Sequence, residues 1–217
     1  SLIKESKKKT GKILVSIFVN PKQFDDKKDF NSYPRDLKND LKILKKLNVD
    51  YLYLPSYQDI YSLKPKNQIY LHSFSKKLCG KTRKKHFEGV INIVNRLLEI
   101  VEPKYIYLGL KDFQQLFLIS AHIKKKSIQT RVISCKTVRE KNGIACSTRN
   151  NALDEKQLLI ASKVYKYLKY KKKLIRKNIT HFNLSNLKKA LSKIGLVKID
   201  YIELLNVKKL KKIKKDR

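Results

Sequence analysis

Side chains that could bind a ligand or take part in catalysis follow the apolar run at residues 104–109. Just past Gly109, the stretch YLGLKDFQQL at 107–116 changes from apolar and aromatic residues to Lys111, Asp112 and two glutamines. A lysine offsets phosphate charge, an aspartate can hold a magnesium ion, and a glutamine amide can hydrogen-bond a carboxylate. The apolar run predicts a buried strand, and ligands of open parallel sheets bind beyond the carboxyl ends of the strands. We therefore expect a binding site at this strand end.

Polar residues also follow two further predicted strands. After the apolar run ILVSIFV at 13–19 come Asn20, Pro21 and Gln23. After the apolar stretch at 127–135, a loop leads to a segment with hydroxyl and guanidinium groups, namely Ser147, Thr148 and Arg149. Amides, a lysine, a carboxylate, hydroxyls and an arginine together are suited to binding a phosphorylated nucleotide beside a small polar acid.

Each of these residues also has a purely structural interpretation. Asn20 before Pro21 is typical of a turn that ends a strand, and Lys111 with Asp112 is typical of a helix N-terminus. For Gln114 we favour an ordinary position on a helix surface. The loop at 147–149 can simply cap the next helix, and the histidines are more often capping, packed or exposed than catalytic; they are His72, His86, His122 and His181. What favours a functional site is the convergence of these residues on one edge of the sheet.

The pattern of elements predicts an α/β fold with two domains. Strands expected at 13–19, 49–55, 104–109 and 127–135 alternate with helices expected at 35–47, 86–101 and 112–126, which indicates a parallel sheet with right-handed crossovers. The segment 56–82 is polar and looks irregular. From about Thr137 a loop, two helical patterns at 154–172 and 184–194 and a strand expected at 197–205 indicate a smaller α+β unit. We therefore place the domains at 1–137 and 138–217.

The composition is strongly basic. The 217 residues include 52 Lys or Arg against 18 Asp or Glu, a formal net charge of +34, and 41% of the residues are hydrophobic. Such a charge raises the possibility of a nucleic-acid-binding protein. Only eight of the basic residues are arginine, the residue that reads phosphates and base edges bidentately. A general drift toward lysine in residue usage explains the charge better, and we do not expect nucleic acid as a partner.

The cysteines and the apolar runs bear on the compartment. Cys79, Cys135 and Cys146 form no C-x-x-C pair and are odd in number, which favours free thiols in a reducing cytoplasm over disulfides or a zinc site. No apolar run approaches the ~20 residues of a membrane-spanning helix. We expect a cytoplasmic protein without membrane attachment.

Several longer motifs resemble the pantoate–β-alanine ligase family. The matching stretches are SIFVNPKQF (16–24), YPRDL (33–37), LCGKTRKKHFEGV (78–90), GLKDFQQL (109–116), TVREKNGIACSTRN (137–150) and KIDYIEL (198–204). They keep the family's order and spacing over nearly the whole chain. The resemblance implies a nucleotidyltransferase with a Rossmann-like domain and a smaller C-terminal lid domain. It also implies a homodimer that uses ATP and Mg²⁺ to join pantoate to β-alanine through pantoyl adenylate, releasing AMP and pyrophosphate.

The resemblance also implies roles for individual residues. Gln23 and Gln115 would hold pantoate together with Asn20, and Gln23 would also lie near β-alanine. Lys111 would contact phosphate, and Asp112 would face magnesium. The whole implied ATP-binding set is Gly109, Leu110, Lys111, Asp112, Val138, Cys146, Ser147, Thr148 and Arg149. Arg83 and His86 match family motif positions without a specific role.

The chain departs from the family pattern at several positions. Leu110 stands where the family has Glu or Gln, Cys146 and Thr148 replace Met and Ser, and a Lys-Lys pair replaces Pro-Gly before His86. The family's Pro-Thr-Met-Gly strand end and His-x-Gly-His helix start would lie upstream of Ser1, and further strands would follow Arg217. We therefore expect a fragment that lacks the N-terminal strand and the catalytic histidines of the family and is inactive by itself.

Three alternatives remain open from the sequence. Another adenylate-forming nucleotidyltransferase could carry the same motifs and use a different acid. The charge leaves a basic nucleic-acid-binding protein possible, and a partial gene could be translated without a working product. A dependence of turnover on pantoate would separate the first alternative from the ligase, and steeply salt-dependent nucleic-acid binding would support the second.

Overall fold

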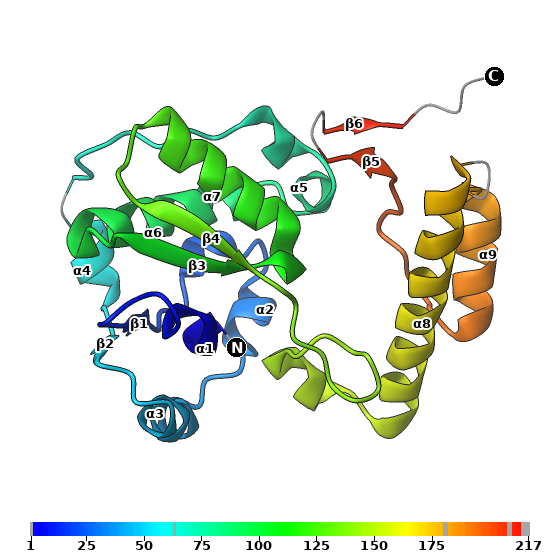
Figure 1. The fold of residues 1–217 in the computed structure, drawn as a ribbon, viewed down its shortest axis with the longest axis horizontal. Helices are drawn as coiled ribbons and strands as arrows, with labels where there is room; N and C mark the ends of the chain where they lie inside the picture. Colours follow the sequence, from blue (N-terminus) through cyan, green and yellow to red (C-terminus); the bar gives the residue numbers. More distant parts are fainter. Residues whose placement is uncertain (1, 63, 180–181, 208–209, 214–217) are drawn as a thin grey trace. The chain divides into compact units, whose positions relative to one another are not determined.

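The computed structural model describes residues 2–62, 64–179, 182–207 and 210–213. The chain divides into two compact units, Ser1–Thr137 and Val138–Arg217, coloured from blue to green and from green to red in Figure 1. Each unit has its own elements and its own buried side chains, so each is described by itself. His181 lies outside the described residues.

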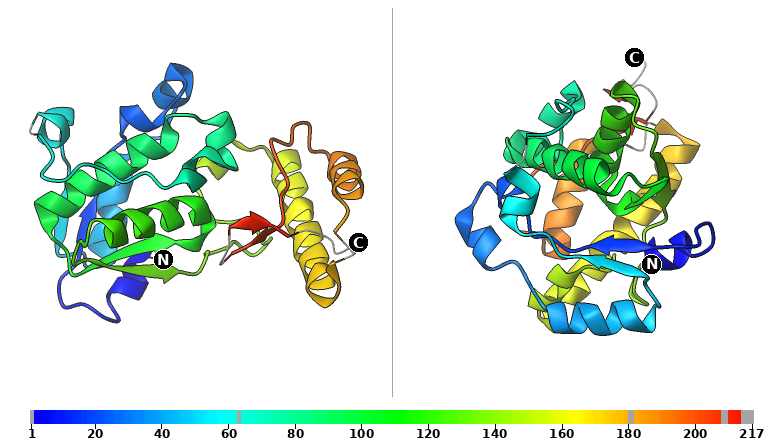
Figure 2. Two further views of the ribbon diagram at one scale, coloured as in Figure 1. Left: turned by 90° about the horizontal axis from the view of Figure 1, so that it is seen from above. Right: turned by 90° about the vertical axis from the view of Figure 1, so that its left-hand side faces the viewer.

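The strands of the first unit form two parallel pairs. β1 (Leu14–Ser16) pairs with β2 (Tyr51–Tyr53), and β3 (Tyr105–Gly109) pairs with β4 (Arg131–Cys135). In the described residues no ladder joins β1 to β3, so the four strands form two separate ribbons, as Figures 1 and 2 show. The predicted parallel pairing is confirmed, although the described strands form two pairs and not one continuous sheet. The strands expected at 13–19, 49–55 and 127–135 are shorter than predicted, because a ladder extends only as far as its partner.

Three helices of the first unit follow their predicted amphipathic patterns. α6 (His86–Val101) supplies much of the core, and α7 (Phe113–Lys125) packs against it; α3 (Leu37–Lys46) is more exposed. Apolar residues at helical spacing explain this packing, since Ile91 and Ile119 are fully buried. The short helices are α1 (Leu2–Ser6), α2 (Lys27–Asn31), α4 (Tyr57–Tyr61) and α5 (Cys79–Thr82). The 3₁₀ turns of this unit are η1 (Pro21–Gln23), η2 (Ser73–Lys76) and η3 (Leu110–Asp112).

The segment 56–82 is more regular than its polar sequence suggests. It contains α4, η2 and α5, and α4 begins with a capping box in which Ser56 and Asp59 satisfy each other's backbone N–H groups. The expectation of an irregular segment was therefore wrong for these short elements. Short helices held by caps and tertiary contacts leave little periodicity to detect.

A buried polar network joins this segment to the two core helices. The fully buried His122 accepts a hydrogen bond from the Tyr70 backbone N–H at Nδ1 (3.1 Å) and donates from Nε2 to Asn95 Oδ1 (2.9 Å). Asn95 in turn donates to Glu99, and the Glu99 carboxylate accepts from Arg96 at 2.6 Å. The network confirms a structural role for His122.

The second unit is mainly helical. α8 (Glu155–Lys177) packs against α9 (Leu184–Ile194), and β5 (Leu205–Asn206) pairs antiparallel with β6 (Lys211–Lys212). The 3₁₀ turn η4 (Thr148–Ala152) precedes α8. The strand expected at 197–205 is wrong except at Leu205, because the preceding alternating residues find no partner strand among the described residues and Val197 is fully exposed. An alternating pattern forms a strand only where a ladder is available.

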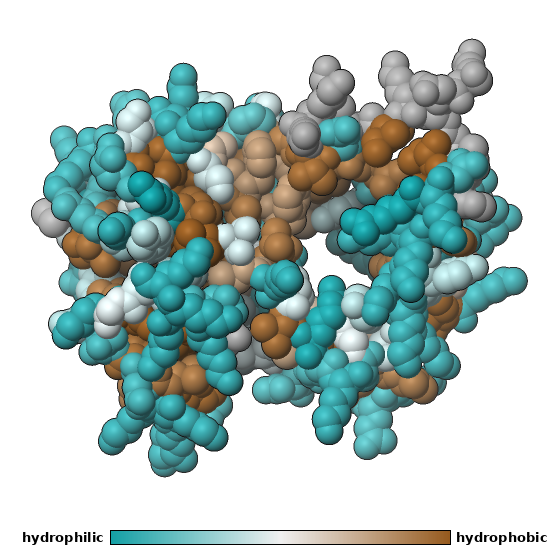
Figure 3. All heavy atoms as spheres, in the orientation of Figure 1, coloured by the Kyte–Doolittle hydropathy of each residue, from teal (hydrophilic) through white to brown (hydrophobic). Residues whose placement is uncertain are grey.

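Polar side chains cover much of the surface on the side that Figure 3 shows. Figure 3 shows hydrophilic residues over much of the face in view, as expected for a chain with 52 basic residues. Among the described residues, no helix combines the length and the apolar character that a membrane span requires. All three cysteines are free thiols, and Cys135 is buried.

Candidate active site

The strand end at Gly109 presents its lysine and aspartate to solvent. β3 ends at Gly109, η3 carries Lys111 and Asp112, and α7 begins at the next residue. Asp112 occupies the N-cap position of α7, but its side chain makes no capping hydrogen bond. Both Lys111 and Asp112 are exposed. The capping interpretation of Asp112 is therefore wrong, and its carboxylate stays available at the positive end of a helix dipole.

The two neighbouring glutamines have different environments. Gln114 is 6% exposed, and its amide nitrogen donates to the carbonyls of Phe74 (2.9 Å) and Lys77 (2.7 Å) while its oxygen accepts from the Cys79 N–H (3.2 Å). Our assignment of Gln114 to the helix surface was wrong, because it fastens η2 and the start of α5 to α7. Gln115 is half-buried, and its side chain has no hydrogen-bond partner among the described residues. Of the two glutamines, Gln115 is the one whose amide is available to a ligand.

Asn20 is a buried anchor for the turn that follows β1. The side chain is 1% exposed; its nitrogen donates to the Gly89 carbonyl (3.0 Å), and its oxygen accepts from the Lys22 N–H (3.1 Å) and the Tyr61 hydroxyl (2.9 Å). Burial raises the pKa of Tyr61 to about 12, so the hydroxyl keeps the proton that it donates. The Asn20 amide is thus largely engaged within the protein, and it fixes η1.

Gln23 stands at the end of η1 with its main chain held and its side chain free. Its carbonyl accepts a hydrogen bond from His86 Nδ1 (2.8 Å) and one from Arg83 Nη2 (3.3 Å). Arg83 Nη1 also lies 3.4 Å from His86 Nε2, and since a guanidinium only donates, His86 Nε2 is the acceptor. His86 is therefore neutral with its proton on Nδ1. The Gln23 side chain has no hydrogen-bond partner among the described residues.

The electrostatics of His86 agree with this protonation state. Burial lowers the pKa of His86, and the nearby Arg83 charge lowers it further, whereas the hydrogen bond to Gln23 and the carboxylates of Asp25 and Asp112 act in the opposite direction. The Asp112 carboxylate, which follows β3, is therefore near enough to His86 to affect its pKa, and His86 in turn contacts the turn after β1.

Residues predicted in the second unit lie on one loop. Arg139 and Ala145 form an isolated antiparallel bridge, and the Cys146 N–H donates to the Val138 carbonyl (3.0 Å). Ser147 caps η4 by accepting from the Arg149 N–H (3.3 Å). Thr148 and Arg149 are exposed. The hairpin thus holds Val138 next to Cys146, directly before the hydroxyl and guanidinium groups.

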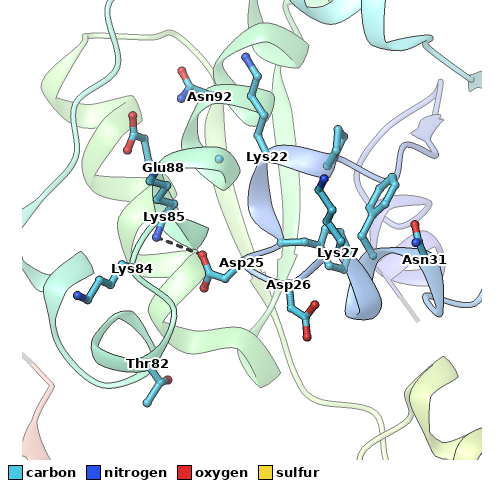
Figure 4. A pocket seen from close by; sticks show the side chains of 14 residues that line it. Lys22, Asp25, Asp26, Lys27, Asn31, Thr82, Lys84, Lys85, Glu88 and Asn92 are labelled. Atoms are coloured by element: carbon cyan, nitrogen blue, oxygen red, sulfur yellow. Dashed lines mark hydrogen bonds between the residues drawn. The ribbon is translucent and has the colours of Figure 1, made fainter.

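A large cavity of the first unit lies beside the η1 turn. Its volume is about 1090 Å³, and its lining includes Lys22, Asp25, Lys84, Lys85 and Glu88, which Figure 4 shows around the N-terminus of α6. None of the residues predicted to bind a ligand lines it. The cavity therefore gives no support to the predicted site, because neither Gln23 nor Gln115 lines it.

Sequence reasoning missed two residues that position the turn. Gly89 lies so close to the turn that an added Cβ would stand 2.4 Å from the Lys22 carbonyl oxygen, so no larger residue fits there. Tyr61, from a segment expected to be irregular, donates to Asn20. The Gly within the helical pattern at 86–101 was the signal for the first residue, since an interior helix glycine often marks a close approach. Nothing in the sequence indicated the role of Tyr61.

The described residues contain no group of three or more His, Cys, Asp or Glu side chains placed to hold a metal ion. Asp112 offers a single exposed carboxylate. That donor set fits Mg²⁺ only in the form in which proteins usually hold it with nucleotides, through one or two carboxylates together with substrate phosphates and water. The chain does not provide an all-protein metal cage within these residues.

The two parallel strand pairs, with helices between the strands, define a Rossmann-like α/β protein, a class whose ligands bind at the carboxyl ends of the strands. The family model for pantoate–β-alanine ligase matches residues 1–217. The chain belongs to the pantoate–β-alanine ligase family.

Individual relatives agree with this assignment. The chain is 39% identical over 221 residues to a pantothenate synthetase of Fervidobacterium nodosum, covering 99% of this chain and 77% of the relative. Among solved structures, a pantothenate synthetase from Thermus thermophilus has a TM-score of 0.88 at 27% identity, with 98% of this chain and 78% of that chain covered. A pantoate–β-alanine ligase from Francisella tularensis, complexed with β,γ-ATP and β-alanine, has a TM-score of 0.81 at 37% identity, with 94% and 76% covered.

Proposed function

We propose that this protein joins pantoate to β-alanine at the expense of ATP, through an enzyme-bound pantoyl adenylate. In the first step a pantoate carboxylate oxygen attacks the α-phosphorus of ATP, the bond to the β-phosphate oxygen breaks, and pyrophosphate leaves. In the second step the β-alanine amine attacks the acyl carbon, loses a proton, and displaces AMP. The family membership and the Francisella complex with an ATP analogue and β-alanine support these substrates.

The observation that carries the proposal is the set of side chains left free beyond β3. Lys111, Asp112 and Gln115 follow the strand within seven residues of Gly109, and none of the three side chains has a hydrogen bond or ion pair recorded within the described residues. We assign Lys111 to the phosphates of ATP and Gln115 to the pantoate carboxylate, and Asp112 would hold a magnesium ion that accompanies the ATP. Mg²⁺ would neutralise phosphate charge, while the protein groups mainly hold the reactants in line.

The remaining site residues receive supporting roles in the proposal. Gln23 binds pantoate and lies near β-alanine, while Asn20 acts by holding the turn, because its own amide is engaged by Gly89, Lys22 and Tyr61. The backbone around Gly109 and Leu110 contacts ATP. In the second unit we assign ATP contacts to Val138, Cys146, Ser147, Thr148 and Arg149, with the unit acting as a lid.

Two further proposals concern the state of the protein. We propose a homodimer, which sedimentation of the purified protein would show as twice the mass of one chain. We also propose a cytoplasmic location, because three free thiols, including the exposed Cys146, suit a reducing compartment.

The experiment that tests the proposed function is a product assay on the protein made from the complete gene. Pantoate, β-alanine and ATP should yield pantothenate and AMP in equal amounts, and leaving out either acid substrate should stop AMP formation. Formation of ADP in place of AMP would refute the adenylate mechanism. Equal turnover with another hydroxy acid in place of pantoate would support the wider nucleotidyltransferase class instead.

A further inference from the structure

The carbonyl of Gln23 is held by two side chains from a segment 60 residues further along the chain. His86 Nδ1 donates to it at 2.8 Å and Arg83 Nη2 at 3.3 Å, and Arg83 also contacts His86 Nε2 at 3.4 Å. Each of the three groups therefore contacts the other two. We propose that Arg83 and His86 are positioning residues that clamp the main-chain carbonyl of Gln23 and thereby aim its side-chain amide at the acid substrate.

Other contacts fix the ends of the turn but leave Gln23 itself to the clamp. Asn20 bonds the Gly89 carbonyl at the start of the turn, and the Lys85 N–H donates to the Asp25 carboxylate (3.4 Å) at its end, a contact drawn in Figure 4. Between these two anchors, the clamp supplies the hydrogen bonds that hold the Gln23 carbonyl.

The turn itself provides little rigidity at this position. Its internal backbone bonds are long, with the Gln23 N–H 3.4 Å from the Asn20 carbonyl and the Phe24 N–H 3.2 Å from the Pro21 carbonyl. A single 3₁₀ turn with hydrogen bonds at the edge of the accepted range depends on outside contacts for its orientation. The orientation of Gln23 therefore depends chiefly on the 2.8 Å bond from His86, the shortest contact of its carbonyl, with Arg83 as a longer second donor at 3.3 Å.

The clamp holds Gln23 by its main chain only, so the side-chain amide of Gln23 stays available to bind an anion. Arg83 and His86 direct N–H groups at an uncharged carbonyl, and neutral His86 shares in this without adding a charge. The Gln23 amide keeps its donors and acceptor free, since its side chain has no partner among the described residues. The inference rests on the proposed function in one respect only, namely that the ligand of Gln23 is pantoate.

The test compares conservative and disruptive substitutions in the protein made from the complete gene. His86→Asn keeps an N–H donor near the position of Nδ1, whereas His86→Leu removes it; Arg83→Lys keeps a donor, whereas Arg83→Met removes it. His72→Asn is the matched control, because His72 caps η2 and makes no contact with Gln23. Two readouts are measured: hydrogen exchange of the amides at 22–24, and the separate dissociation constants of pantoate and ATP.

The clamp predicts that the disruptive variants affect pantoate binding but not ATP binding. Each disruptive variant should speed exchange at 22–24 and weaken pantoate about 10-fold, the effect of one lost hydrogen bond, while the ATP dissociation constant changes less than about 2-fold. His86→Asn should recover most of the pantoate affinity, and His72→Asn should leave both readouts unchanged.

Two other results would contradict the inference in distinguishable ways. Unchanged exchange at 22–24 in both His86→Leu and Arg83→Met would overturn the clamp without reference to any ligand. Faster exchange with unchanged pantoate affinity would show that the clamp holds the turn but does not aim Gln23. If the unsubstituted protein bound ATP but not pantoate, the proposed function would fail, while the exchange measurement would still decide whether the clamp exists.

Discussion

Replacing Gly89 with alanine should displace the turn that carries Gln23. Gly89 lies inside α6, where alanine is favoured over glycine by about 1 kcal/mol. Helix propensity alone therefore predicts stabilisation. The structure predicts the opposite, because the new Cβ would meet the Lys22 carbonyl oxygen at 2.4 Å, the Lys22 carbonyl carbon at 2.6 Å and the Gln23 nitrogen at 2.8 Å. All three atoms are backbone, so no side chain can rotate away.

The size of the effect follows from these distances. Ordinary contact begins near 3.4 Å, so the turn must retreat by about 1 Å, which would stretch the 3.0 Å bond between Asn20 and the Gly89 carbonyl beyond hydrogen-bonding range. Overpacking typically costs about 1–3 kcal/mol and a lost hydrogen bond about 1 kcal/mol. After the gain in helix propensity, the free energy of unfolding should fall by about 1–3 kcal/mol. Because Gln23 is proposed to bind pantoate, a displacement of this size should lower turnover by roughly 10²-fold.

Urea unfolding and steady-state kinetics together test this prediction. Gly11→Ala is the control, because a Cβ there meets nothing within 4 Å, and its unfolding free energy should change by less than about 0.5 kcal/mol. If Gly89→Ala were as stable as the unsubstituted protein or more stable, with unchanged turnover, the close approach between α6 and the turn would be refuted.

The neighbouring glutamines and the buried histidine give two further predictions. Gln114→Leu should lower the free energy of unfolding by about 3 kcal/mol, since it removes three hydrogen bonds to backbone groups at about 1 kcal/mol each. Gln115→Leu should leave stability nearly unchanged and weaken pantoate binding. Urea unfolding measures the first effect, and titration of pantoate measures the second. Burial, together with the Lys126 charge, lowers the pKa of His122 despite the opposing effect of Glu99, so its folded-state pKa lies below the unfolded value of about 6.5. The unfolded state then binds more protons, and stability should be intact above about pH 6.5 and fall as the pH drops through that value toward the folded-state pKa. Unfolding curves at several pH values test this, and an equally steep acid loss in His122→Gln would contradict the assignment.

The helices with strong apolar periodicity could be predicted from the sequence. The expected bounds 86–101 and 184–194 agree with α6 and α9, because each pattern repeats over several turns and ends at a residue with left-handed backbone, Glu102 or Gly195. The strand at 104–109 was found for a similar reason, since an apolar run that ends in glycine is a clear signal. Local patterns were sufficient for these elements.

The errors concern features that depend on distant partners. The sequence around Gln114 does not show that the carbonyls of Phe74 and Lys77 reach its amide across about 40 residues, so its burial could not be predicted. The strand expected at 197–205 failed because alternation does not supply a partner strand. The hydrogen bonds from Arg83 and His86 to the Gln23 carbonyl could not be predicted either, because every residue has a main-chain carbonyl and the sequence does not show which one is bound. The sequence offers candidate site residues, which stay predictions, but it does not show the contacts that position them.

Pantoate-dependent exchange of pyrophosphate into ATP tests the central claim most directly. The assay detects reversible formation of the adenylate without β-alanine, and it is made on the protein from the complete gene and on two lysine variants. Lys111→Ala removes the proposed phosphate contact, and Lys124→Ala removes an exposed lysine of the same helix region as a control. We predict exchange that requires pantoate, survives in Lys124→Ala and falls by at least about 10²-fold in Lys111→Ala. Exchange that proceeds without pantoate, or that is equal in both variants, would contradict adenylate formation at this site.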